Sequence, residues 1–476
     1  MVQEEKKLKK RSYTIIVLLC IVAVFISGYL LLTHINQNTS DNQTRIQVSQ
    51  MNPNSIVNIS YKYKDREYEF IKSSNTWIYA EDEDFPLDNS FIEYMTVRLG
   101  DIVSTMRIGE VNDTNFTDLG FNKPTLVIRA STDDGMVYEY TIGSYSEIIS
   151  RYYMLINDEK EIHIVEQGLV NAFSYDLYDM IEMDIPPEFY SSAVTRFSIE
   201  KDKKIIKFNY FEDGIKNSYS NHFQWSITDD TDREYIAGTE KIVNLLSYTG
   251  YGLKIDRCVL YNAKESDYSE FGLDNPVVIS IDYIDDFMRI NTIKYYIGKQ
   301  ISNQYYFMFE NSSMIFLIDV AIAEPLMLTD PLQFRSDMLM MIKLESIDRM
   351  IIKTSSDSFV VNMIRNSESK DVDDKNTIYT INGKEISYRE MNDIYSLIYF
   401  TAADKVLPDQ YATDDVPKVS IEFERNTEEY MNMTMDFVPY DSSYYVVLFN
   451  DRKDQLFAIH RVDELLSRIE LLINRV

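Results

Sequence analysis

Few residues in this chain have the types and the spacing that catalysis or metal binding requires. The 476 residues include two cysteines and four histidines, and no two histidines have a local spacing suited to one metal ion. Motifs for a nucleophile elbow, a phosphate loop, a zinc protease or a dinucleotide site are absent from the sequence. We therefore expect no enzymatic activity, no cofactor and no metal. The histidines are His34, His163, His222 and His460. His163 stands at a strand position that Phe316 and Phe457 occupy in two similar segments, so we expect it to be a packing residue. Cys258 is expected to be a buried apolar residue, and the other cysteine, Cys20, lies in an apolar run near the N-terminus.

Acidic residues are the other candidates for chemistry. Residues 229–232 and 371–374 are rich in aspartate, whose oxygens suit Ca²⁺, but neither has the glycine at position six and the glutamate at position twelve of an EF-hand loop. We expect both to be solvated turns. With 76 acidic residues some pair must lie close together, so a hydrolase that uses two carboxyl groups is the least favoured function.

Paired tyrosines recur at three matching places and form the candidate interaction surface. In an antiparallel strand one member of each pair would point inward and the other outward. If several rings were exposed and coplanar, they could instead stack on sugars. That second reading predicts an extracytoplasmic module that binds cell-wall polysaccharide or peptidoglycan. The residues are Tyr152, Tyr153, Tyr305, Tyr306, Tyr444 and Tyr445.

Composition and charge exclude several classes of protein. Hydrophobic residues make up 45% and charged residues 26%, which is typical of globular domains. Aspartate and glutamate outnumber lysine and arginine by 76 to 47, which gives a net charge of -29. A nucleic-acid partner is excluded because such proteins need a basic surface.

The N-terminal region has the pattern of a membrane anchor. Residues 13–33 contain no charged side chain, and about 20 apolar residues in a helix cross a hydrocarbon core. Residues 1–12 are rich in lysine and arginine, which stay in the cytoplasm. We expect a single-pass cell-membrane protein with a cytoplasmic tail (1–12), a helix in contact with lipid (13–33), a polar linker (34–54) and an extracytoplasmic bulk. A cleaved signal peptide would have a shorter apolar region and a small-residue cleavage site.

The remainder of the chain contains internal repeats. Trp77 and Trp225 begin similar segments, and the same order of motifs returns around Pro124 and Pro276. A fainter copy follows, with Pro417 at the matching place and no glycine before it. The predicted domains are residues 55–190, 191–340 and a diverged third unit, 341–476.

Each unit shows the pattern of strands and helices in one order. Alternating apolar residues predict strands, and Asp133-Asp134-Gly135 predicts a hairpin turn. Ser387 and Glu390 form a capping box before an apolar helical stripe, and Asn89 or Ser90 could cap the corresponding first helix. The predicted fold class is α+β: three related repeats of antiparallel meander sheet with packed helices.

The segments around Gly120-x-x-x-Pro124 with Ile142-Gly143, and around Gly272-x-x-x-Pro276 with Ile297-Gly298, follow the anchor in a recognisable arrangement. In each, the glycine permits a positive φ after a helix or turn, and the proline begins the next strand. This arrangement resembles the bacterial family called domain of unknown function 4340. The resemblance implies an anchored extracytoplasmic protein, often encoded beside ABC-transporter permeases of the kind linked to gliding motility, and it implies no catalytic residue.

Together these expectations favour a non-enzymatic, membrane-anchored scaffold or accessory protein. Permease and ATPase subunits of an ABC transporter are the expected protein partners. A module that binds cell-wall polysaccharide or peptidoglycan is the alternative, and a hydrolase is the last choice.

Overall fold

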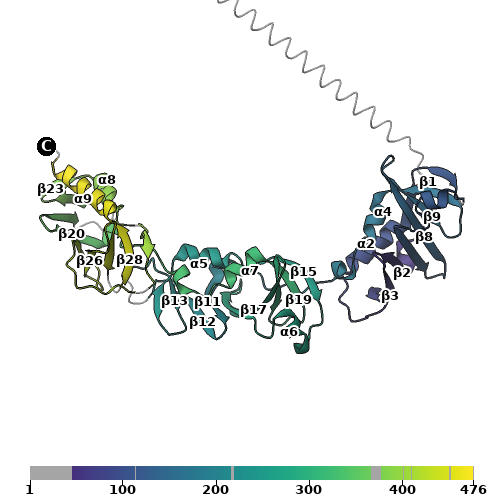
Figure 1. Cartoon of the computed structure of the whole chain (residues 1–476), viewed down its shortest axis with the longest axis horizontal. Helices are drawn as coiled ribbons and strands as arrows, with labels where there is room; N and C mark the ends of the chain where they lie inside the picture. Colours follow the sequence, from purple (N-terminus) through teal and green to yellow (C-terminus); the bar gives the residue numbers. More distant parts are fainter. Residues whose placement is uncertain are drawn as a thin grey trace, which may run out of the picture. The chain divides into compact units, whose positions relative to one another are not determined.

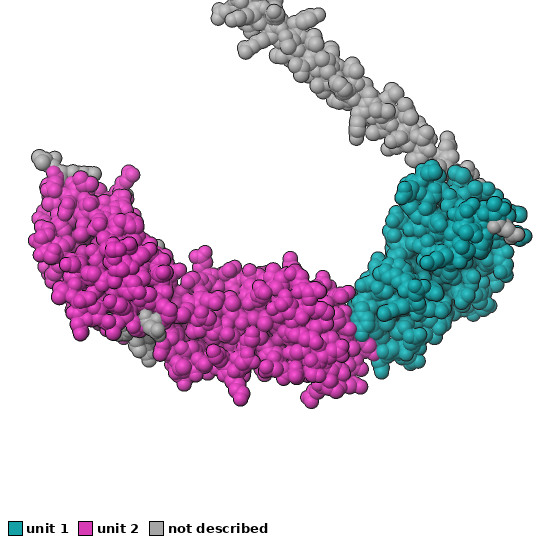
Figure 2. Space-filling model, in the orientation of Figure 1, with its two compact units in different colours: residues 1–183 teal, residues 184–476 magenta. Residues whose placement is uncertain are grey.

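The computed structural model describes residues 46–474 apart from residues 113, 216–218, 366–376, 400, 409, 450 and 451. The chain divides into two compact units, residues 1–183 and residues 184–476 (Figure 2). Within the described ranges, the first unit holds one large sheet and one small sheet, and the second unit holds two large sheets (Figure 1). These large sheets are named the first, second and third sheet in chain order.

The first sheet has the strand order β4-β3-β2-β7-β8-β9-β10-β6, and its neighbours are antiparallel. A two-stranded sheet, β1-β5, accompanies it. The strands are β1 (Ile46–Gln50), β2 (Ile56–Tyr63), β3 (Arg66–Ser73), β4 (Thr76–Tyr79), β5 (Asp101–Ser104), β6 (Arg107–Glu110), β7 (Leu126–Thr132), β8 (Val137–Ser146), β9 (Arg151–Ile156) and β10 (Glu161–Val165).

The second sheet has the order β14-β13-β12-β11-β16-β17-β18-β19-β15, and the third has the order β23-β22-β21-β20-β25-β26-β27-β28-β24. The strands of the second are β11 (Val194–Lys201), β12 (Lys204–Tyr210), β13 (Trp225–Thr228), β14 (Glu234–Ile236), β15 (Ile255–Leu260), β16 (Val277–Ile284), β17 (Ile290–Ile301), β18 (Gln304–Phe309) and β19 (Ile315–Asp319). Those of the third are β20 (Ile347–Thr354), β21 (Ser358–Arg365), β22 (Thr377–Ile381), β23 (Lys384–Ile386), β24 (Lys405–Val406), β25 (Val419–Arg425), β26 (Asn432–Pro439), β27 (Tyr444–Phe449) and β28 (Arg452–Ala458).

One topology describes all three large sheets. A first meander is followed by a helix, and a second meander then pairs through its first strand with the first strand of the first meander. The central pairs are β2 with β7, β11 with β16 and β20 with β25. The predicted antiparallel meanders are confirmed, although the described residues are mostly β-sheet and helices contribute less than the α+β class suggests.

Helices pack on the sheets through apolar stripes. In the view of Figure 1, α5 and α7 lie along one side of the second sheet. The α-helices are α2 (Asn89–Gly100), α3 (Asn115–Asp118), α4 (Gln167–Ala172), α5 (Thr239–Leu246), α6 (Tyr268–Phe271), α7 (Val320–Leu326), α8 (Tyr388–Tyr395) and α9 (Ile459–Asn474). The 3-10 helices are η1 (Pro53–Ser55), η2 (Leu177–Met180), η3 (Ser191–Ala193), η4 (Gly250–Gly252), η5 (Glu265–Asp267), η6 (Pro331–Phe334) and η7 (Leu344–Ser346).

Local signals placed one predicted helix start correctly and another slightly wrongly. The capping box at Ser387 is confirmed, because its side chain accepts a hydrogen bond from the Glu390 amide and the Glu390 carboxylate accepts one from the Ser387 amide. In α2 the N-cap is Asp88 rather than Asn89 or Ser90. Asn89 is the first helical residue, and its side-chain oxygen instead accepts a hydrogen bond of 2.7 Å from the amide of Trp77.

The predicted polar linker extends too far into the folded part. Ile46–Gln50 forms β1, which pairs with β5, and the following Met51 is buried. The prediction missed this strand because it has only two apolar residues, Ile46 and Val48, within a polar segment. Residues 34–45 of that linker, the predicted tail (1–12) and the predicted transmembrane helix (13–33) lie outside the described residues. Within the described part of the chain, no helix has the length and apolar character needed to span a bilayer.

The Gly-x-x-x-Pro and Ile-Gly motifs meet in space, and steric limits explain them. Gly272 is the left-handed cap of α6, with φ of +69°, and a Cβ there would lie 2.7 Å from the amide nitrogen of Lys299. A Cβ on Gly298 would lie 2.2 Å from the carbonyl oxygen of Phe271. The first sheet repeats this crossing at Gly120 and Gly143. The motifs therefore mark a close backbone approach.

Replacing Gly272 by alanine should destabilise the second unit by roughly 1–3 kcal/mol, because the substitution adds both a left-handed strain and a clash. Gly383→Ala is the matched control in the same unit, since its φ is +78° and nothing lies within 4 Å of its Cβ position. Urea unfolding of both variants measures the difference. Equal losses would show that the close approach contributes nothing.

Candidate interaction sites

The six predicted tyrosines lie at equivalent places on β9, β18 and β27, and all are half-buried. The second tyrosine of each pair packs on an apolar neighbour. Tyr153 contacts a cluster that includes Phe121 and Leu155. The rings of Tyr306 and Tyr445 meet neighbouring phenylalanines edge to face, with centroid distances of 4.9 and 6.2 Å.

The first tyrosine of each pair has a more varied environment. Tyr152 meets the ring of Tyr145 at 5.0 Å with a tilt of 59°. The hydroxyl of Tyr305 lies 3.5 Å from the side-chain oxygen of Gln300, and Tyr444 packs on a small apolar cluster of the third sheet. The structure therefore spreads the tyrosines over three sheets, one pair on each, and their role in binding stays a prediction.

Two of the polar candidates, His163 and Asp229, occupy structural positions, whereas His34 and residues 371–374 lie outside the described residues. His163 lies inside the first sheet and is 3% exposed, as expected for a packing residue. Asp229 accepts hydrogen bonds from the amides of Thr231 and Arg233 and from the hydroxyl of Tyr235, so it organises its own turn. These bonds help to hold the pKa of this carboxyl below its usual value, although burial opposes them. Across the part of the chain that the structure describes, no group of three or more potential ligands could hold a metal ion.

Cys258 is a buried apolar residue of β15, as the sequence predicts, and it is 1% exposed. Burial raises the pKa of its thiol to about 11. Because the thiolate is the reactive form, we expect no labelling of the folded Cys20→Ser variant by a thiol reagent at pH 8 and one equivalent of labelling after unfolding. Rapid labelling of the folded protein would contradict the buried position.

Residues 335–338, here called the connector, join the second and third sheets within the second unit. Arg335 forms a β-bridge with Ala237 beside the second sheet, and the next amide, that of Ser336, donates to the carbonyl of Ile236. Three residues beyond Arg335, Met338 forms a β-bridge with Ala402, in the segment that leads into β24 of the third sheet. The connector is therefore hydrogen-bonded to residues beside both sheets.

Buried charges reinforce this connector. The side chain of Arg335 is 6% exposed and forms an ion pair with Asp454 on β28, whose side chain is 1% exposed. The guanidinium of Arg335 also lies 4.7 Å from the centre of the Tyr235 ring. Arg452 donates to the carbonyl oxygens of Ser336 and Met338 over 2.6 and 2.8 Å, and burial lowers its pKa.

Aromatic residues from the second sheet enter the core of the third. Tyr219 and Phe223, in the loop between β12 and β13, belong to the apolar cluster of the third sheet. The ring of Tyr219 meets that of Phe449 at 4.9 Å and that of Tyr430 at 6.4 Å. Arg425 donates a hydrogen bond of 3.2 Å to the carbonyl of Tyr219. The two sheets therefore share part of one core.

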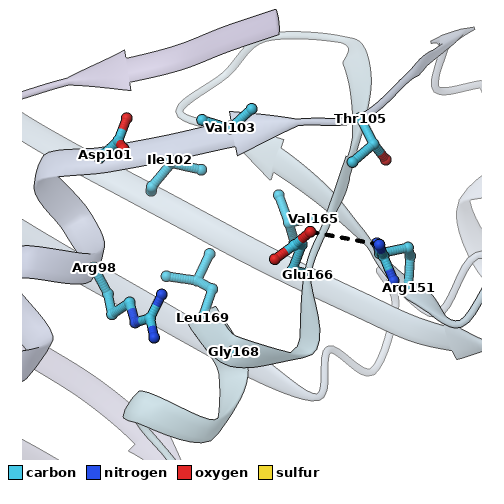
Figure 3. Close-up of a pocket in the computed structure, with 10 residues that line it drawn as sticks. All are labelled: Arg98, Asp101, Ile102, Val103, Thr105, Arg151, Val165, Glu166, Gly168 and Leu169. Atoms are coloured by element: carbon cyan, nitrogen blue, oxygen red, sulfur yellow. Dashed lines mark hydrogen bonds and ion pairs between the residues drawn. The ribbon is translucent and has the colours of Figure 1, made fainter. Parts of the chain in front are cut away.

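A separate cavity of about 390 Å³ lies in the first unit (Figure 3). Its charged side chains come from three elements: Arg98 from α2, Asp101 from β5 and Arg151 from β9, joined by Glu166 next to α4. Buried apolar residues also line it, namely Ile102, Val165 and Leu169.

The sequence predicted neither the connector nor the cavity. Asp454 follows Arg335 by more than a hundred positions, and Arg98 and Arg151 lie in elements that only the fold brings together. The single local signal was a pair of aromatic residues, Tyr219 and Phe223, in a loop. An aromatic pair in a long polar loop indicates a docking segment.

Comparison with known proteins gives a family and no described function. No curated protein and no solved structure matches the chain. The family model described as Domain of unknown function (DUF4340) matches residues 77–235 and again residues 225–415. Each match begins at a tryptophan in the first meander of a sheet, Trp77 in β4 or Trp225 in β13, and ends beyond the sheet in which it began. Since these matches extend over more than half of its length, the chain belongs to the DUF4340 family.

Proposed function

We propose that this protein is a non-enzymatic, single-pass membrane protein whose three related extracytoplasmic repeats act as an interaction scaffold, as an accessory of an ABC-transporter complex. The shared topology of the three large sheets supports the repeats. The apolar run at residues 13–33 and the basic tail before it support the anchor and its orientation. The transporter partner rests on the family resemblance.

The connector, which is bonded to residues beside both the second and the third sheet, is the main observation in favour of a scaffold. A scaffold must keep its binding surfaces at fixed separations, which requires junctions that resist bending. Arg335 forms an ion pair with Asp454, and Tyr219 packs in the apolar cluster of the third sheet. These contacts join the second and third sheets into one body. A junction stabilised by a buried ion pair and buried aromatic rings suits a protein that must keep its binding surfaces at fixed separations.

In-cell crosslinking of the full-length protein, followed by detergent purification and mass spectrometry, tests this proposal. We expect an ABC permease and its ATPase at near-stoichiometric yield. A chain reduced to residues 1–54 is the control for proteins that co-purify with any membrane anchor.

Two other results would replace the proposal. Recovery of cell-wall fragments without a membrane partner would favour the polysaccharide or peptidoglycan module and its tyrosine-bearing strands. Release of soluble sugars or peptides from cell walls by the purified protein, lost on changing a single acidic residue, would favour a hydrolase.

A further inference from the structure

The cavity of the first unit has the composition of a small-molecule site. Two guanidinium groups lie on opposite sides of it in Figure 3, with the carboxylate of Glu166 between them. Ile102, Val165 and Leu169 form the apolar part of the lining, here called the apolar floor, and are at most 6% exposed. A concave surface with an apolar floor and a few convergent polar groups is typical of ligand sites.

The two arginines are positioned but not fully engaged. Arg98 donates a hydrogen bond of 2.8 Å to the hydroxyl of Tyr94, and its guanidinium lies 4.9 Å from the centre of that ring. Gly168 lies beside it, since a Cβ there would make an ordinary van der Waals contact of 3.9 Å with the guanidinium. Arg151 contacts Glu166 over 3.4 Å, a long contact at a partly exposed site. A guanidinium fork matches the two oxygens of a carboxylate, so a ligand carboxylate can replace this contact.

The balance of charge narrows the class of ligand. Asp101 and Glu166 bring two negative charges to the cavity, which offset the two arginines. A doubly charged phosphate would be repelled by these carboxylates, whereas a singly charged carboxylate with an N–H donor beside it can pair with the arginines and donate to the acids. An α-amino acid, or the last residue of a peptide, has a carboxylate, a nearby amino or amide N–H group, and a side chain for the apolar floor.

Two of the charged groups, Arg151 and Asp101, are particular to the first sheet, whereas Asp319 precedes α7 as Glu166 precedes α4. Arg151 directly precedes its tyrosine pair, whereas Gln304 and Ser443 stand at the matching positions of the second and third sheets. The β1-β5 sheet, which supplies Asp101, accompanies only the first large sheet within the described ranges. The cavity therefore arises from additions to the common topology rather than from the topology itself.

We propose that this cavity binds the α-carboxylate of an amino acid, or of the carboxy-terminal residue of a peptide, with an apolar side chain. Arg98 and Arg151 receive the carboxylate, and the side chain rests on the floor formed by Ile102, Val165 and Leu169. Asp101 and Glu166 accept hydrogen bonds from the nitrogen. This proposal does not depend on the scaffold role or on the transporter partner.

Calorimetric titration of the full-length protein in detergent tests the site with L-leucine and L-alanyl-L-leucine as probes. We expect binding of at least one probe and no binding of L-leucinamide, which lacks the carboxylate. Binding of leucine alone would identify free amino acids as the source, and binding of the dipeptide alone would identify peptide termini. Arg151→Gln, which introduces the residue of the second sheet, and Arg98→Gln should each weaken binding by roughly tenfold or more.

Arg129→Gln is the matched control, because Arg129 pairs with Glu139 on the surface and does not line the cavity. It should bind like the unchanged protein, and thermal unfolding should confirm that all three variants are folded. Three results would overturn the proposal: no heat from either probe, equal binding of leucinamide, or binding that survives in both cavity variants. Binding of inorganic phosphate in place of both probes would also overturn it.

Discussion

Replacing Asp454 by alanine is expected to destabilise the second unit by about 3–5 kcal/mol, because the change leaves the buried guanidinium of Arg335 without its carboxylate. An unpaired charge at this depth loses its hydration and gains no partner of opposite sign. The midpoint of urea unfolding, followed by tryptophan fluorescence, measures the loss. Trp225 on β13 of the second sheet provides the signal within this unit.

Two further variants separate this effect from general sensitivity to substitution. Glu464→Ala removes the partner of Arg468 in an ion pair whose side chains are both about half exposed, and it should cost less than about 1 kcal/mol. Exchanging both buried partners for apolar residues, Arg335→Met with Asp454→Leu, should restore much of the stability. An Asp454→Ala variant as stable as the unchanged protein would show that the pair does not hold the junction.

Replacing Phe223 by alanine should destabilise the third sheet although Phe223 belongs to a loop of the second. Its side chain is 2% exposed, and its ring meets that of Tyr219 edge to face at 5.3 Å. Truncating a buried phenylalanine to alanine costs roughly 3–5 kcal/mol. We expect amide hydrogen exchange to become faster in β25, β26 and β27, which form the core that this loop enters.

The location of the effect is the informative result. Val243→Ala, on the exposed side of α5, is the matched control and should leave exchange in the third sheet unchanged. If Phe223→Ala accelerated exchange only around its own loop and in the second sheet, the contacts of this loop would not contribute to the stability of the third sheet. The junction would then be a contact between independent sheets.

The parts of the fold that sequence reasoning predicted depend on neighbours in the chain. The Ser387 capping box and the left-handed cap at Gly272 are decided within four residues, so their residue types reveal them. The packing role of His163 followed from the aromatic residues at matching places in the other copies. β1 was missed because only two of its five residues, Ile46 and Val48, are apolar, which is too few to establish an alternation.

The junction and the cavity could not be predicted because they depend on distant pairs. Arg425 and Tyr219 are 206 positions apart, and nothing local to either residue indicates the other. Among 47 basic and 76 acidic residues, the pairing of Arg335 with Asp454 is one of many that the sequence permits. Only the register of the strands selects it.

The central strand pairs have a consequence for synthesis of the chain. In the first sheet Ile59 pairs with Ala130, and in the second Ile199 pairs with Ile279, so these sheets close through residues made about 70 to 80 positions apart. At a translation rate of roughly 5–20 residues per second, the first meander waits for several seconds before its partner strand emerges. During that interval β2, β11 and β20 in turn present an open edge able to pair with other chains. The nascent protein therefore passes through three successive periods of vulnerability to aggregation, one for each sheet.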